Sequence, residues 1–154
     1  MANNRAIHEA TLRIPYPYTP KDGREYLNRA MSDMLEDKEY IFAILLNETS
    51  ACIGTFVFKM NLSDNKAEIG YWLGEPFWGK GYITEVVQRM LAFGFIELGL
   101  HRIEAHHLLF NKASGKVLEK CGLTLEGQLR SEVKHGALYH DVVLYGLTKD
   151  DYSD

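Results

Sequence analysis

The stretch that decides the fold is "KAEIGYWLGEPFWGKGYITEVVQRMLAFGFIEL", residues 66–98. Its first part, 66–74, is rich in apolar and aromatic residues and predicts a strand. Its second part predicts a helix that ends at Gly99. The apolar residues on one face of that helix are Ile83, Val86, Val87, Met90 and Leu91. A glycine-containing loop therefore leaves a strand and opens a helix, whose N-terminus favours anions.

The loop matches most of the P-loop motif of nucleotide-binding proteins: Gly74 is followed after four residues by Gly79-Lys80. Gly81 stands where a hydroxyl would ligate Mg²⁺, and the third glycine of a dinucleotide fingerprint is missing. Gly79 and Gly81 nevertheless allow positive φ, so successive N–H groups can form an anion-binding nest beside Lys80. From these residues alone, two interpretations stay open: a phosphate cradle, or a tight turn between strand and helix.

Outward from this stretch, the order is helices, three strands, the loop, a long helix, a strand, a short helix and a β-hairpin. A helix begins at Thr19 as its N-cap and Pro20 as its first residue. Its apolar positions at helical spacing are Tyr26, Leu27, Ala30, Met31, Met34 and Leu35. Strand patterns cover 40–47, 51–60 and 102–109, a short helix runs from Asn111 to Lys120, and two strands join around His135-Gly136. We expect one α/β (α+β) domain, 1–154, with helices on a mixed, mostly antiparallel sheet.

Composition limits the function classes. The net charge of −4 argues against direct nucleic-acid binding, although segment 79–120 is net positive and suits an anionic ligand. The two cysteines, Cys52 and Cys121, have no metal-ligand spacing. The longest apolar run, 40–46, is too short to span a membrane, and the N-terminus lacks a signal-peptide layout. We therefore expect a cytoplasmic protein without a metal.

Three segments carry a family resemblance: "AEIGYWLGEPFWGKGYITEVVQRMLAFGFIELGLHRIEA", "NKASGKVLEKCGLTLEG" and "YHDVVLYGL". In this order and at these intervals they resemble the GNAT superfamily of acetyl-CoA-dependent N-acetyltransferases, in the branch of the ribosomal-protein N-terminal acetyltransferases. The resemblance implies two splayed central strands, acetyl-CoA as co-substrate, and no metal. It also implies acetyl transfer to a primary amine, either a protein N-terminus or a small molecule.

The family's pyrophosphate motif, Gln/Arg-x-x-Gly-x-Gly/Ala, falls on residues 78–83. Trp78 and Ile83 depart from it, and the β-branched Ile83 could crowd the pyrophosphate. The cofactor-binding residues implied by the resemblance are Trp72, Leu73, Trp78, Gly79, Lys80, Gly81, Tyr82, Ile83, Thr84, Asn111, Ser114, Lys116, Val117 and Lys120. Asn111 equally suits a helix N-cap, and Lys116 and Lys120 either meet the 3′-phosphate of the cofactor or face solvent.

The resemblance also implies catalytic roles. A backbone N–H near Leu73 would donate to the oxyanion, and Ser114 would donate to the departing thiolate. Our candidate base is Glu68, which strand alternation places on one face with Gly70 and Trp72. A solvated strand carboxylate is the competing interpretation of Glu68. Tyr139 and Tyr145 are alternative acids, and one residue of the pair His106-His107 must face the ligand side.

One departure concerns the N-terminus. Members of this branch usually begin with a strand before the first helix, whereas this chain opens with "MANNRAIHEATLRIPYPYT". Three interpretations stay open: the first strand is missing, it is supplied by a partner chain, or it has been lost from the gene model. An unpaired sheet edge would be left, which predicts edge pairing in a homodimer. The absent first strand, with Trp78 and Ile83, favours an alternative function: a non-catalytic or degenerate acyl-CoA-binding module.

Overall fold

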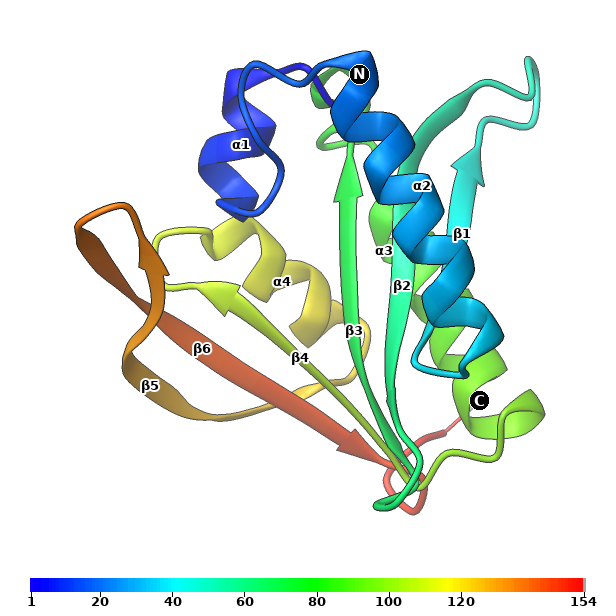
Figure 1. The fold of residues 1–154 in the computed structure, drawn as a ribbon. Coiled ribbons are helices and arrows are strands. Elements are labelled where there is room, and N and C mark those ends of the chain that lie inside the picture. The colour runs from blue at the N-terminus through cyan, green and yellow to red at the C-terminus, as the bar shows by residue number, and fades with distance from the viewer. Residues whose placement is uncertain (154) are drawn as a thin grey trace. The chain divides into compact units, whose positions relative to one another are not determined.

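The computed structural model describes residues 1–153 and contains both helices and strands (Figure 1). The elements are α1 (Arg5–Thr11), α2 (Pro20–Leu35), β1 (Glu39–Leu45), β2 (Cys52–Asn61), β3 (Lys66–Leu73), the 3₁₀ turn η1 (Glu75–Phe77), α3 (Tyr82–Ala92), the π-helical turn η2 (Phe93–Glu97), β4 (Arg102–Leu108), α4 (Lys112–Lys120), β5 (Thr124–His135) and β6 (Leu138–Thr148). The strands and long helices expected from the sequence are confirmed. Helix α1 is an addition, and its N-cap Asn4 accepts hydrogen bonds from the backbone N–H groups of Ala6 and Ile7.

Hydrogen bonds join six strands in the order β1-β2-β3-β4-β6-β5. The pairs β1–β2, β4–β6 and β5–β6 are antiparallel, so the expected fold class and mostly antiparallel sheet are confirmed. The chain divides into two compact units. The first unit contains Met1–Met60 and Ile69–Lys80, and the second contains Asn61–Glu68 and the chain from Gly81 onward. Strand β3 passes from the second unit to the first after Glu68.

The core of the first unit is built on β2. Phe56 and Phe58 are fully buried there, because alternate residues of the strand face the interior. Ile53, out of phase with them, is also fully buried and lies where the register between β1 and β2 shifts. Helix α2 begins with the expected N-cap, Thr19, followed by Pro20, and Thr19 forms a reciprocal capping box with Asp22 in the first turn.

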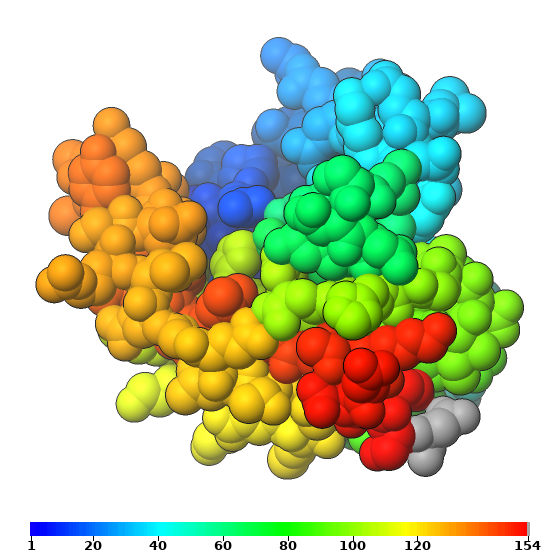
Figure 2. All heavy atoms as spheres, turned by 90° about the horizontal axis from the view of Figure 1, so that it is seen from below, coloured from blue at the N-terminus to red at the C-terminus, as the bar shows by residue number. Residues whose placement is uncertain are grey.

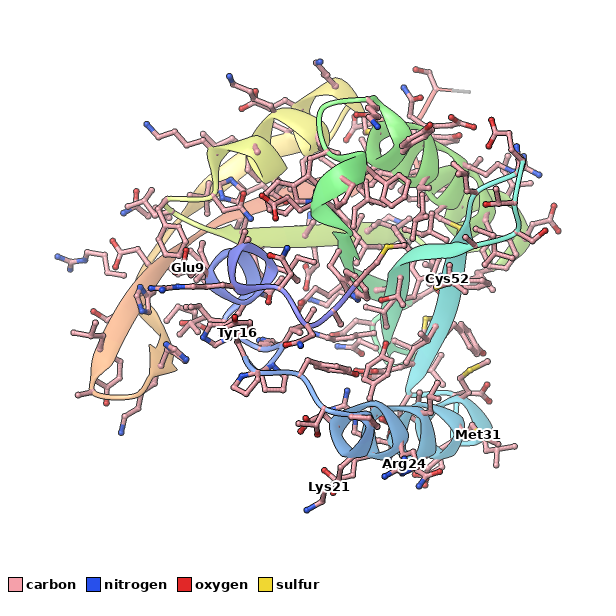
Figure 3. The ribbon with its side chains drawn as sticks, turned by 90° about the horizontal axis from the view of Figure 1, so that it is seen from above. Glu9, Tyr16, Lys21, Arg24, Met31 and Cys52 are labelled. Carbon is pink, nitrogen blue, oxygen red and sulfur yellow. The ribbon has the colours of Figure 1, made fainter. Side chains whose placement is uncertain are left out.

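The apolar residues of α2 are mostly exposed. Ala30 is buried, whereas Leu27, Met31, Met34 and Leu35 are exposed. Figure 3 shows the labelled Lys21, Arg24 and Met31 side chains on α2 projecting away from the strands. Helical spacing thus predicted the helix correctly and included the buried Ala30, but most of the other predicted apolar positions are exposed.

The core of the second unit joins two helices to β4. Val87 and Leu91 of α3, Leu118 of α4 and Ile103 of β4 are buried. Helix α3 widens into the π-helical turn η2 before the chain reverses at Gly99, whose φ is 66°. The hairpin of β5 and β6 turns at Gly136, as expected, and its atoms form a projecting lobe (orange in Figure 2).

Candidate functional site

The glycine loop has the backbone that its sequence predicted. Gly79 and Gly81 have φ values of 71° and 87°, in the left-handed region that favours glycine. Gly81 is the N-cap of α3, which starts at Tyr82. A Cβ built on either glycine would meet no heavy atom within 4 Å. The backbone conformation, rather than crowding, therefore calls for glycine at both positions.

The loop also has the electrostatics of an anion site. The first N–H groups of α3 lack acceptors within the helix, and the helix dipole makes that end positive. Trp78, Gly79, Lys80 and Gly81 are all exposed. The Lys80 ammonium lies 5.7 Å from the centroid of the Phe77 ring. This arrangement can hold a phosphate or pyrophosphate through backbone N–H groups and one cation.

Trp78 has a partner that the sequence did not predict. Its indole Nε1–H donates to the carbonyl oxygen of Leu73 at 2.7 Å. The next residue, Gly74, donates its N–H to the Ile53 carbonyl at 2.8 Å. The end of β3 is therefore held from two sides within the first unit.

In the second unit, Glu68 lies beside His106. The His106 Nδ1 and Glu68 Oε1 atoms are 3.4 Å apart, and both side chains are about a quarter exposed, 27% and 28%. Of the two adjacent histidines, His106 therefore faces Glu68, whereas His107 is buried. Glu68 is thus in contact with a second group that can accept a proton, and its role as a base stays a prediction.

The other carboxylates on this side of β4 are paired. Lys66 Nζ lies 3.2 Å from Glu104 Oε1, and Arg102 Nε lies 3.1 Å from Glu104 Oε2. Arg102 also pairs with Glu126, which raises the pKa of the guanidinium and lowers the pKa of the Glu126 carboxyl. These pairs leave little uncompensated negative charge on Glu104 and Glu126.

Helix α4 brings Asn111 and Ser114 together. Asn111 is its N-cap, as expected, and Asn111 Oδ1 accepts from the Ser114 N–H at 3.4 Å. Ser114 and Val117 are partly buried, and Lys116 and Lys120, one turn apart, are exposed. This geometry confirms the cap, and the cofactor roles of these residues stay predictions.

The sequence did not predict a cluster of a buried tyrosine and a buried histidine beneath α4. The Tyr145 hydroxyl donates to Glu119 Oε1 at 3.0 Å, and burial raises the pKa of this tyrosine. The His107 Nδ1–H donates to the Leu108 carbonyl at 2.8 Å. A Cβ built on Gly115 would lie 2.7 Å from His107 Nε2. A glycine inside a helix pattern was the available signal for this close approach. Tyr139, the other alternative acid, is exposed on the hairpin with Lys134 over its ring.

Residues 1–153 contain neither a cluster of metal-ligand side chains nor a membrane-spanning helix. Within this range, His, Cys, Asp and Glu side chains form no group of three or more that could hold a metal ion. The helices of the same range include none long and apolar enough to cross a membrane.

The sequence is similar to a family model and to known proteins that are all acetyltransferases. A family model described as an acetyltransferase (GNAT) domain matches residues 1–124. An N-acetyltransferase named p20 from Bacillus licheniformis is 37% identical over 139 residues, which cover 89% of this chain and 78% of that protein. YdaF of Bacillus subtilis (strain 168), to which a ribosomal N-acetyltransferase activity is ascribed, is 34% identical over 116 residues, covering 75% of this chain and 63% of YdaF.

Solved structures agree with the sequence relatives. The crystal structure of a GNAT-family acetyltransferase from Bacillus anthracis superposes with a TM-score of 0.84 at 27% identity. The match covers 97% of this chain and 85% of that one.

Proposed function

Since the chain belongs to the acetyltransferase (GNAT) family and is an N-acetyltransferase with acetyl-CoA as co-substrate, we propose that its acceptor is the primary amine of a protein N-terminus. A small-molecule monoamine is the second candidate. The observation that carries the cofactor part of this proposal is the loop itself: two glycines with positive φ directly before the N-terminus of α3. Its N–H groups would bind the pyrophosphate of acetyl-CoA.

The residues would divide the chemistry as follows. Glu68, in contact with His106, would take the proton from the attacking amine nitrogen. The Leu73 N–H would stabilise the oxyanion that forms when that nitrogen bonds to the thioester carbon. The C–S bond would then break while the Ser114 hydroxyl donates a hydrogen bond to the leaving thiolate, which would take up a proton from solvent as Glu68 releases its proton to solvent. Asn111, Lys116, Val117 and Lys120 on or next to α4 would contact the rest of the cofactor.

The charge pattern of the second unit favours a single amine over a polycation. A polyamine needs several carboxylates with uncompensated charge, yet Glu104 and Glu126 are paired with Lys66 and Arg102. The activity ascribed to YdaF also suits a protein acceptor.

We further propose that the protein acts in the cytoplasm as one domain, 1–154, without direct nucleic-acid or membrane partners. Strand β1 stands at the end of the strand order, which supports a homodimer that pairs through its outer edge. Sedimentation of the purified protein tests the last point: a monomer at all concentrations contradicts it.

The test of the function begins with calorimetric titration of acetyl-CoA into the wild-type protein and into Gly81→Glu. We expect binding by the wild type and its loss in the variant, because a carboxylate would enter the nest. Gly136→Glu is the matched control: it places the same side chain on another glycine with positive φ, at the tip of the hairpin. No binding by folded wild-type protein would overturn the proposal.

Turnover separates an enzyme from a binding module. Thiol release from acetyl-CoA is measured with a panel of short peptides and with small monoamines. Peptide-dependent release supports the N-terminal acceptor, whereas monoamine-dependent release supports the second candidate. Tight binding without release for any amine would favour the non-catalytic acyl-CoA-binding module.

A further inference from the structure

The peptide that links Trp72 to Leu73 has a defined direction in the first unit. A Cβ built on Gly54 of β2 would overlap the Trp72 carbonyl oxygen, so that oxygen faces β2 at close range. The one cis peptide among residues 1–153 lies elsewhere, at Tyr16-Pro17. In a trans peptide the N–H points opposite to the carbonyl. The Leu73 N–H is therefore directed away from β2.

The following peptide, between Leu73 and Gly74, is fixed at both of its polar ends. Its N–H donates to Ile53 of β2 at 2.8 Å, and its carbonyl accepts from the Trp78 indole at 2.7 Å. Because the N–H and C=O of one strand residue point to the same side, the Leu73 carbonyl and the Leu73 N–H share the edge of β3 that faces away from β2. The indole thus holds the carbonyl next to the N–H proposed as the oxyanion donor.

We propose that Trp78 and Gly54 are positioning residues for acetyl transfer, an inference that rests on the function proposed above. Gly54 lets β2 approach and sets the direction of the Leu73 N–H. Trp78 fixes the adjacent carbonyl, so that the backbone cannot rotate the N–H away from the reacting oxygen. The tryptophan that departs from the pyrophosphate motif therefore serves the carbonyl of the acetyl group rather than the pyrophosphate.

This role predicts a selective effect on ligands. When the amine attacks, the carbonyl π electrons move to oxygen, and the Leu73 N–H donates to that oxygen before the C–S bond breaks. Acetyl-CoA has this carbonyl oxygen and CoA does not. A change in the direction of the N–H should therefore weaken acetyl-CoA more than CoA, whereas a change in the pyrophosphate nest should weaken both equally.

The test is Trp78→Phe, which keeps an aromatic ring and removes the N–H. Trp78 is 43% exposed, so the variant should fold. Calorimetric titrations with acetyl-CoA and with CoA are run on the wild type and the variant. Because the variant loses one positioning hydrogen bond, we expect acetyl-CoA to bind about fivefold more weakly. The affinity for CoA should change by less than about twofold. The infrared carbonyl band of bound ¹³C-acetyl-CoA should also shift toward its position in a non-hydrogen-bonded thioester.

Tyr40→Phe is the control, since it removes another aromatic hydrogen bond of the first unit, from the Tyr40 hydroxyl to Asp37. It should leave both affinities unchanged. If Trp78→Phe weakens both ligands equally, or neither, the inference is wrong while the proposed function stands. If the wild type binds neither ligand, the proposed function itself fails. Gly54→Ala, checked for folding by circular dichroism, should reproduce the selective loss.

Discussion

At the scale of single residues, glycine serves two separate purposes in this chain. Gly81 adopts a positive φ in open space, where its backbone shapes the ligand loop. Gly115 has a helical backbone but lies against His107 and Tyr145, where a side chain has no room. A substitution at the first position should affect binding, and one at the second should affect stability.

Gly115→Ala is expected to destabilise the protein by about 1–2 kcal/mol, because the overpacking against His107 exceeds the gain in helix propensity. The new Cβ would lie 2.7 Å from His107 Nε2 and 3.2 Å from the Tyr145 oxygen. Urea unfolding measures the change. Gly127→Ala serves as the control, since a Cβ there meets no heavy atom within 4 Å. An unchanged or higher stability of Gly115→Ala would contradict the close packing.

Tyr145→Phe tests whether the buried tyrosine protonates the thiolate. Its hydroxyl already donates to Glu119, and burial raises its pKa. We expect a stability loss of about 1 kcal/mol from the missing hydrogen bond and turnover within about threefold of the wild type. Thiol-release kinetics decide the point: a loss of about 10²-fold or more would identify Tyr145 as the acid instead.

Residue identity predicted some site positions and not others. The loop glycines and the Asn111 cap depend on local backbone rules, which the sequence contains. Which of the two histidines faces Glu68 depends on the phase of β4 in the sheet, because adjacent strand residues point to opposite faces. In the sequence, Trp78 is only a departure from a motif. Its hydrogen bond could not be predicted, because the acceptor, the Leu73 carbonyl, is a backbone group without a sequence signature.

At the scale of elements, the sequence predicted the caps and turns correctly but did not predict how the elements pack. The Thr19 N-cap of α2 and the hairpin turn at Gly136 lay where local patterns placed them. The exposed apolar residues of α2 and the π-helical turn after α3 were not predicted. Both depend on which neighbours an element meets, and helical spacing reports only that an apolar face exists.

The ion pair between Arg102 of β4 and Glu126 of β5 predicts a pH dependence. The hydrogen bond with Arg102 lowers the pKa of Glu126 from its ordinary value of 4.5 in the folded protein. The pair therefore stabilises the fold above that value, and the effect disappears as pH falls through the lowered pKa. Glu126→Gln should lower the unfolding free energy by about 0.2–1 kcal/mol at pH 7.

The difference between wild type and Glu126→Gln should shrink as the pH falls from 5 to 3. Urea midpoints at pH 7, 5 and 3 measure it, with Glu132→Gln on the same strand as the control for removing a carboxylate. A difference that stays constant or grows at low pH would show that the pair contributes nothing through its charge.

At the scale of the whole molecule, each of the two units is built from two separate segments of the chain. Residues 69–80 belong to the first unit, although residues 61–68 before them belong to the second. Strand β3 belongs to both units, since it starts in the second at Lys66 and ends in the first at Leu73. The sequence could predict β3 as a strand, but its division between units arises from long-range pairing that no local pattern encodes.

This sharing predicts that the protein unfolds as one cooperative domain. Neither unit keeps a complete β3 without the other, so melting of one should leave the other with an incomplete strand. Scanning calorimetry should give a single transition whose calorimetric and van't Hoff enthalpies agree. Acetyl-CoA at about 100 times its Kd should raise the unfolding free energy by about 2.7 kcal/mol and shift that single transition upward. Two separate transitions, with only one of them shifted by acetyl-CoA, would instead show that the units fold independently and that the cofactor stabilises just one.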